Sequence, residues 1–257
     1  MRSIKAEVKV FAASIALLAA AETITCFINP GFGMLSHSFI LLMLLALSVF
    51  WSKLNPGSEL FLSLSLAPLT RIISLSLPLI QLPRYTWYIA SGALMLLASM
   101  AVIRISMLSP KDLGITLKQP ITQLGLSVIG LPLGALEYLI LKPEPLALGL
   151  SMVDYVLLAI AIAFFTGFVE ELVFRGIMQN VAVKALGWKA GLLGVNMIFT
   201  LLHLGWFSAL DMIFVFAAGL IFGHTVLKTG SIIGASIAHG LTNVGLFIIF
   251  PMLWKDL

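Results

Sequence analysis

The chain has 257 residues, of which 60% are hydrophobic and only 10% are charged, whereas soluble proteins carry about 25% charged residues. This composition excludes a soluble globular protein and indicates an integral membrane protein in contact with the lipid bilayer. The formal net charge of +4 comes from basic residues that stand singly between apolar segments, so nucleic acid is not an expected partner. The single cysteine, Cys26, allows neither an intramolecular disulfide nor a cysteine-ligated metal site.

Apolar segments follow one another from end to end, and their lengths predict an all-α, polytopic bundle of transmembrane helices. Nine spans can be drawn, or eight if the short second segment is re-entrant. No polar block between them is long enough to fold as a separate soluble domain. The apolar segments cover approximately residues 8–28, 37–51, 60–80, 85–103, 122–141, 152–182, 188–204, 210–227 and 232–253.

Basic residues indicate how these spans are oriented. Arg2, Lys5 and Lys9 precede the first apolar segment. We interpret this segment as an uncleaved span rather than a secretory signal, because apolar character continues to Phe27 and further spans follow. In a nine-span arrangement, most basic residues of the later loops fall on the same side as the amino terminus. The positive-inside rule therefore favours nine spans and a cytoplasmic amino terminus in a multi-pass protein of the cytoplasmic membrane.

Several polar groups lie inside the first five apolar segments. Glu22, Arg71 and Glu137 are interpreted as structural groups, and pairing between helices is one explanation for them. Four serines alternate with leucine between residues 63 and 76, which is the period of a strand. We nevertheless expect a helix there, because a lone strand would leave backbone groups unpaired in lipid.

The densest polar group inside an apolar segment is the pair Glu170 and Glu171, followed by Arg175. A charged side chain within a span costs at least ~2.5 kcal/mol, so such a group indicates partners, water and chemistry. Glu171 and Arg175 are four residues apart and share a helix face, whereas Glu170 is rotated away by about 100°. We therefore expect Glu171 to form an ion pair with Arg175, and Glu170 to face a cavity.

Two later segments carry polar groups at the same expected depth. Glu170 and His203 lie equally far in sequence from the turn at 184–189, so two antiparallel helices joined there bring them to one level. His239 and Asn243 are one helical turn apart on one face of the last span, and they reach the same layer. A carboxylate, two imidazoles and an amide are therefore expected to converge.

This set of side chains matches the needs of peptide hydrolysis. Glu170 is the predicted general base, and His203 is expected to orient or deprotonate the attacking water. His239 and Asn243 are expected to bind the negative charge that develops on the attacked carbonyl. Phe199, one turn before His203, is expected to pack beside the site.

Metal chemistry is the alternative for the same residues, because Glu170, His203 and His239 could hold Zn²⁺ or another divalent metal with an open position for water. The helical His-Glu-x-x-His sequence of common zinc proteases is absent, and the three would-be ligands come from separate segments. We therefore expect that no cofactor is required.

The polar residues resemble the motifs of the CPBP family, the CAAX protease and bacteriocin-processing group, which is also called the abortive-infection family and includes the type II CAAX prenyl endopeptidase. The family pattern is Glu-Glu-x-x-x-Arg, then Phe-x-x-x-His, then His-x-x-x-Asn. The pattern is present in full as Glu170, Glu171 and Arg175, then Phe199 and His203, then His239 and Asn243. Each motif is short, but three in this order within apolar segments are specific.

The resemblance covers about residues 155–250 and implies an intramembrane endopeptidase, from a family described both as metalloproteases and as glutamate-dependent enzymes without metal. It divides the chain into variable amino-terminal spans, 1–120, and a catalytic transmembrane core, 121–257. The implied substrate is a membrane-associated peptide or protein, which is either a lipidated CAAX-type protein or a bacteriocin-like peptide. The alternative is a non-proteolytic membrane protein, either a proton-coupled transporter or a peptide-binding immunity or scaffold protein.

Overall fold

The computed structural model describes residues 2–52, 58–77, 84–146 and 148–254, and every regular element within these ranges is helical. The amino-terminal half contains seven α-helices and one short π-helical segment, η1. They are α1 (Arg2–Thr23), η1 (Ile24–Ile28), α2 (Pro30–Ser52), α3 (Ser58–Leu64), α4 (Leu66–Ser76), α5 (Arg84–Ile105), α6 (Pro120–Val128) and α7 (Gly130–Leu141). The prediction of an all-α bundle is confirmed.

The carboxyl-terminal half mixes α-helices with short π and 3₁₀ segments. They are α8 (Met152–Ile162), η3 (Ala163–Phe168), α9 (Val169–Glu171), η4 (Leu172–Gln179), α10 (Asn180–Leu186), α11 (Trp188–Leu201), η5 (Leu204–Trp206), α12 (Ala209–Thr229), α13 (Ile233–Val244), η6 (Gly245–Ile249) and α14 (Phe250–Leu253). Serine caps begin two of these helices, because the Ser151 and Ser208 hydroxyls accept backbone N–H groups three residues later. Gly187 and Gly230, both with positive φ, end α10 and α12.

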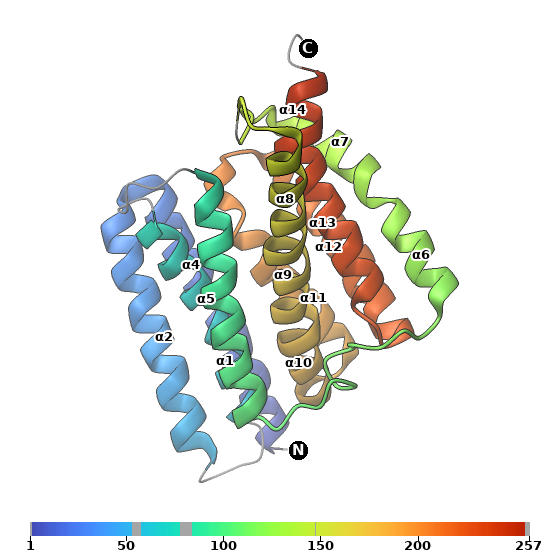
Figure 1. The fold of residues 1–257 in the computed structure, drawn as a ribbon. Helices are drawn as coiled ribbons and strands as arrows, with labels where there is room; N and C mark the ends of the chain where they lie inside the picture. The colour runs from blue at the N-terminus through green and yellow to red at the C-terminus, as the bar shows by residue number, and fades with distance from the viewer. Residues whose placement is uncertain (1, 53–57, 78–83, 147, 255–257) are drawn as a thin grey trace.

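Eight helical stretches in the described part of the chain are long and apolar enough to cross a membrane. The segment expected to be short, 37–51, belongs to the 23-residue helix α2, so the short element lies elsewhere. It is α11, which has 14 residues and ends just before His203. The start of α1 and the end of α14 lie at opposite ends of the bundle (Figure 1).

The serine-rich segment is helical, as expected, but it forms two helices, α3 and α4, that meet at Ser65. Its hydroxyls are satisfied locally. Ser63 Oγ donates to the Leu60 carbonyl at 2.8 Å, and Ser65 Oγ donates to the Leu62 carbonyl at 2.7 Å. Bonds of this kind allow serine in a membrane helix without a partner on another helix.

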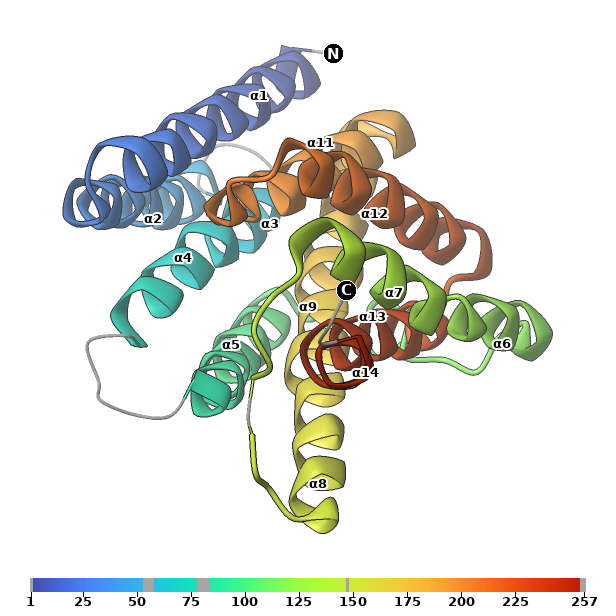
Figure 2. The same cartoon turned by 90° about the horizontal axis from the view of Figure 1, so that it is seen from above.

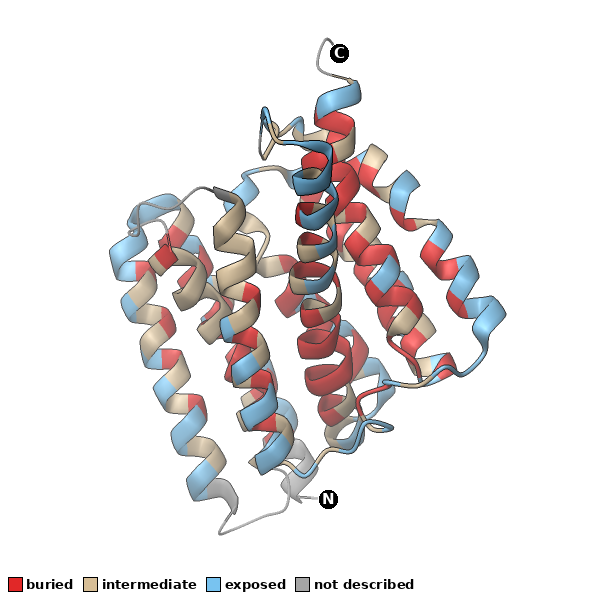
Figure 3. Ribbon diagram, in the orientation of Figure 1, coloured by how far each residue is buried: buried red, intermediate tan, exposed pale blue. Residues whose placement is uncertain are grey.

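The helices α8, α9 and α10, with the π segments between them, form one continuous rod at the centre of the bundle. The views in Figures 1 and 2 place α1 to α5 on one side of the rod, and α6 and α7 on the other. The rod and α13 carry much of the buried surface, whereas α2 and α6 present many exposed residues (Figure 3). In the stretch Ile233–Leu253, 72% of the apolar window is buried, the largest share among the candidate spans. The division of the chain into variable amino-terminal spans, 1–120, and a catalytic core, 121–257, stays a prediction.

The rod touches α13 backbone to backbone at two glycines. A Cβ atom added to Gly167 would lie 2.6 Å from the Cα of Gly240 and 2.8 Å from the Ser236 carbonyl oxygen. Only glycine permits so close an approach between membrane helices. This contact lets the polar side chains of η3 and α9 meet those of α13.

Candidate active site

The Glu170–Glu171 pair lies in a short α-helical turn between two π-helical segments, η3 and η4. Wide turns of this kind are rare and occur frequently at functional sites, because they change the direction of neighbouring side chains. Glu171 is fully buried, whereas the Glu170 side chain is 35% exposed and lines a cavity. The two carboxylates therefore differ in surroundings, as the rotation between them requires.

The ion pair expected from the sequence is present. Nη1 of Arg175 donates to Oε1 of Glu171 at 2.8 Å, and both side chains are almost fully buried. The Arg175 guanidinium also lies 4.4 Å from the centre of the Phe199 ring, a cation–π distance. Phe199 therefore packs beside the site, as expected, and holds Arg175 against Glu171.

His239 lies between the two carboxylates. Its Nδ1 donates to Oε1 of Glu171 at 2.9 Å, and its Nε2 lies 3.8 Å from Oε2 of Glu170. The hydrogen bond to Glu171 fixes the orientation of the ring and leaves Nε2 directed toward Glu170. The sequence motif gave no indication of this link between Glu171 and His239.

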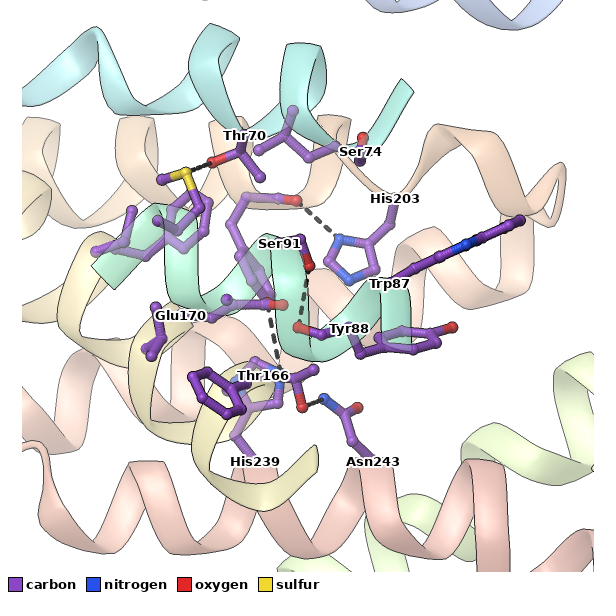
Figure 4. A pocket seen from close by; sticks show the side chains of 18 of the residues that line it. Thr70, Ser74, Trp87, Tyr88, Ser91, Thr166, Glu170, His203, His239 and Asn243 are labelled. Atoms are coloured by element: carbon purple, nitrogen blue, oxygen red, sulfur yellow. Dashed lines mark hydrogen bonds and ion pairs between the residues drawn. The ribbon is translucent and has the colours of Figure 1, made fainter. Parts of the chain in front are cut away.

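His203 lies in the turn that follows α11. Its Nδ1 donates to the Phe199 carbonyl oxygen at 2.9 Å, which leaves Nε2 as the acceptor of the neutral ring. The preceding carbonyl, that of Leu202, accepts a hydrogen bond of 2.7 Å from Nη2 of Arg71. Figure 4 shows His203 across the cavity from Glu170, so the two side chains that were expected at one depth do line the same space.

Asn243 completes the set through a residue that the sequence reasoning missed. Its Nδ2 donates to Oγ1 of Thr166 at 2.8 Å (Figure 4). The Thr166 hydroxyl in turn donates to the Ile162 carbonyl at 2.7 Å. Thr166 therefore fixes the amide of Asn243 and leaves the second N–H of Nδ2 available. The position of Thr166, four residues before Glu170, could have revealed it, since residues at this spacing share a helix face.

The cavity has a volume of about 450 Å³ and collects side chains from distant parts of the chain. Its aromatic wall is formed by Trp87, Tyr88, Phe165, Trp206 and Phe247. Its polar groups include the four predicted catalytic residues and two residues interpreted as structural from the sequence, Arg71 and Glu137. Pairing between helices is present for Arg71, whose Nη2 lies 2.6 Å from Oε2 of the buried Glu22.

The cavity lining includes the three side chains that were considered as metal ligands, Glu170, His203 and His239. In residues 2–52, 58–77, 84–146 and 148–254, no group of three or more His, Cys, Asp and Glu side chains could hold a metal ion. Nδ1 of each histidine in the cavity is also occupied, by Glu171 for His239 and by the Phe199 carbonyl for His203. Only Nε2 of each ring is therefore left to face the cavity.

The fold and the cavity define a class of protein, a polytopic helical membrane protein with carboxylate, imidazole and amide side chains that line a cavity between its helices. Comparison with family models finds a match in the carboxyl-terminal part of the chain. Residues 152–245 match the family described as type II CAAX prenyl endopeptidase Rce1-like. This match confirms, for this segment of the chain, the resemblance found in the motifs.

The matched segment contains all seven motif residues, from Glu170 to Asn243. Arg71 and Glu137 lie outside it. No curated protein and no solved structure matched the chain.

Proposed function

We propose that this protein is an intramembrane endopeptidase in which Glu170 activates a water molecule for attack on a peptide bond. The observation that carries the proposal is the different environment of the two adjacent glutamates. Glu171 is buried against Arg175 and His239, whereas Glu170 faces a cavity that also contains His203 and Asn243. A base in a cavity, with hydrogen-bond donors opposite it, is what hydrolysis requires.

Each side chain has one task in the proposed reaction. Glu170 takes a proton from water, and Nε2 of His203 accepts the second water hydrogen and so orients the attacking oxygen. The oxygen attacks the carbonyl carbon, and the negative charge on the carbonyl oxygen is bound by Asn243 Nδ2 and by a protonated His239. Glu171 compensates the charge of that imidazolium. Glu170 then transfers its proton to the leaving amine, and the C–N bond breaks.

The reaction is proposed to need no metal, with Zn²⁺ or another divalent metal as the alternative. The support is that, in the described part of the chain, no group of three or more His, Cys, Asp and Glu side chains is placed to hold a metal ion. Elemental analysis of the purified protein, combined with cleavage assays after chelation, tests this proposal. We expect full activity after chelation. A stoichiometric metal that is lost together with activity in His203→Ala and His239→Ala would contradict it.

The proposed substrate is a membrane-associated peptide or protein that enters between the helices. Aromatic side chains line much of the cavity, so an apolar peptide segment or an attached lipid would find an apolar wall there. The Rce1-like segment supports a CAAX-type protein as the substrate. A bacteriocin-like peptide is the alternative substrate.

Comparative mass spectrometry of membrane peptides tests the proposed function in cells. Cells with the wild-type protein should contain truncated peptides that are missing from cells with Glu170→Ala, while both proteins insert to the same level. Glu144→Ala is the matched control, because Glu144 is exposed and lies outside the cavity. Identical peptide sets in the wild type and Glu170→Ala would contradict the proposal and would favour a non-proteolytic protein.

The amino-terminal end of the bundle is proposed to face the cytoplasm. Loops that carry lysines lie together at one end, since Lys184 pairs with Asp112 at 2.8 Å and Thr116 Oγ1 donates to the Gly230 carbonyl at 3.0 Å. Lys111 and Lys228 lie in or next to these loops, and clustering of lysines marks the cytoplasmic side. A reporter that folds only in the cytoplasm should be active when fused to the amino terminus, and an inactive fusion would reverse the assignment.

A further inference from the structure

Arg71 brings a permanent positive charge to the cavity wall. Among the lining residues in the described part of the chain it is the only lysine or arginine, and the acids there are Glu137 and Glu170. Arg71 lies on α4 and is distant in sequence from the matched segment 152–245. The motifs of the family therefore give it no role.

Two of the three guanidinium nitrogens of Arg71 are bound to protein. Nε donates to Oε1 of Glu22 at 2.7 Å, while Nη2 lies 2.6 Å from Oε2 of Glu22 and donates to the Leu202 carbonyl at 2.7 Å. These contacts fix the plane of the guanidinium group. The side chain keeps 14% of its surface exposed, whereas Glu22 has none.

The third nitrogen, Nη1, has no hydrogen-bond partner among the residues that the structure describes. Gly205, which also lines the cavity, is its neighbour, and a Cβ atom added to Gly205 would lie 4.0 Å from Nη1. The absence of a side chain at Gly205 leaves this nitrogen uncovered. An arginine nitrogen in a half-enclosed cavity requires an acceptor, and carboxylate oxygen is a preferred one.

We propose that Nη1 of Arg71 binds the α-carboxylate at the carboxyl terminus of the substrate. The inference rests on the proposed CAAX-type endopeptidase activity, in which the cut lies close to the chain end and a free carboxylate enters the cavity with the scissile bond. The Leu202 carbonyl that binds Arg71 is adjacent to His203, so the carboxylate site lies next to a residue proposed to position the water. The preference for the carboxyl terminus of the substrate then comes from a residue of α4, which lies outside the matched segment 152–245.

The pairing with Glu22 is compatible with this role. Guanidinium presents five N–H donors in a plane, and one carboxylate occupies only one edge of it. Glu22 holds the Nε and Nη2 edge, so the Nη1 side can receive a second carboxylate. Glu22 thereby orients Arg71 and keeps its positive charge stable within the membrane.

Binding to an inactive protein tests the proposal without requiring cleavage. The full-length Glu170→Gln protein in detergent is titrated with a fluorescent, S-farnesylated Cys-Val-Leu-Leu peptide that ends in either a carboxylate or a carboxamide. We expect the carboxylate peptide to bind about tenfold more tightly, which corresponds to one charge-assisted hydrogen bond. Adding Arg71→Gln should reduce this ratio to about one by weakening only the carboxylate peptide.

A second pair of variants separates recognition from the structural role of Arg71. Gly205→Asp, in the same Glu170→Gln background, places a competing carboxylate beside Nη1 and leaves the Glu22 and Leu202 contacts in place, so it should also abolish the preference. Gly205→Ala is the matched control and should keep it. Thermal unfolding of each variant identifies any that fails to fold.

Equal binding of the two peptides to the Glu170→Gln protein, or binding of neither, would overturn the proposal. A preference that survives both Arg71→Gln and Gly205→Asp would also overturn it. Failure of the proposed function gives a different result. In that case the carboxylate peptide binds preferentially through Arg71, but the wild-type protein does not cut it.

Discussion

Nδ1 of His239 lies 2.9 Å from Oε1 of Glu171, the same oxygen that accepts Nη1 of Arg175 at 2.8 Å. One carboxylate oxygen therefore holds both the imidazole and the guanidinium. This shared oxygen directs the other imidazole nitrogen toward Glu170, at 3.8 Å. The second glutamate of the motif thus positions the residues that surround the first one.

Replacement of Glu171 by glutamine should be costly for the fold. The change leaves the buried Arg175 without its counter-charge, and loss of one partner of a buried ion pair costs about 3–5 kcal/mol. We expect a large decrease in the unfolding temperature and loss of cleavage. The double variant Glu171→Gln with Arg175→Gln should regain part of the stability but no cleavage, because His239 still lacks its carboxylate. A single Glu171→Gln variant as stable as the wild type would contradict the assignment.

The hydroxyl of Thr166 should matter for catalysis through Asn243. Thr166→Val keeps the shape of the side chain but removes the acceptor that orients Nδ2 of Asn243. A net hydrogen bond contributes about 0.5–1.5 kcal/mol, so the cleavage rate should fall by up to about tenfold. Thr166→Ser retains the hydroxyl and serves as the control. Steady-state cleavage rates of the three proteins check this prediction, and a Thr166→Val rate equal to that of Thr166→Ser would refute it.

The contact between Gly167 and Gly240 should tolerate no side chain. A Cβ at Gly167 would meet backbone atoms of α13 at 2.6 Å, and neither helix can move without displacing Glu170 or His239. Gly167→Val should therefore abolish cleavage and lower the unfolding temperature. Gly125→Ala is the control, because nothing lies within 4 Å of that position, and alanine is favoured over glycine in a helix by about 0.8–1 kcal/mol. Normal activity of Gly167→Val would show that the contact does not align the site.

The ion pair between Asp112 and Lys184 should make stability depend on pH at the lysine-rich end. The Lys184 ammonium, together with the Ser109 hydroxyl, holds the pKa of Asp112 below its ordinary value of 3.8. A lowered pKa in the folded state adds stability above the ordinary value, and this stability is lost as pH falls through the lowered pKa. Both side chains are substantially exposed, so the effect is small.

The measurement for this pair is the unfolding temperature of the wild type and of Asp112→Asn as a function of pH. The wild type should be slightly more stable at neutral pH, and the difference should shrink as the medium is acidified below about pH 4. A difference that grows on acidification would contradict the sign of the effect.

Features that depend on local sequence were predictable. Segment length indicated the membrane spans, and the four-residue spacing of Glu171 and Arg175 indicated their ion pair. The common cavity of Glu170 and His203 followed from equal distances to one turn. Each of these predictions required only helix geometry.

Features that depend on how the helices pack were not predictable. The π-helical segments around α9 have no clear signal in the sequence, and they alter which side chains face the cavity. The hydrogen bond of Thr166 to Asn243 depends on the packing of η3 against α13. The contact of Arg71 with the Leu202 carbonyl depends on the packing of α4 against the turn after α11. The apolar segment 188–204 is not among the candidate spans, because its helix α11 is short and ends before His203.

Cleavage of a defined peptide by the purified protein tests the central claim most directly. The wild type and Glu170→Gln are compared after chelation, with the product identified by mass spectrometry and folding checked by thermal unfolding. The account predicts cleavage at one peptide bond by the wild type and a rate at least ~100-fold lower in the folded Glu170→Gln protein, since a general base contributes that much. A Glu170→Gln protein that cleaves the peptide at the wild-type rate would contradict it.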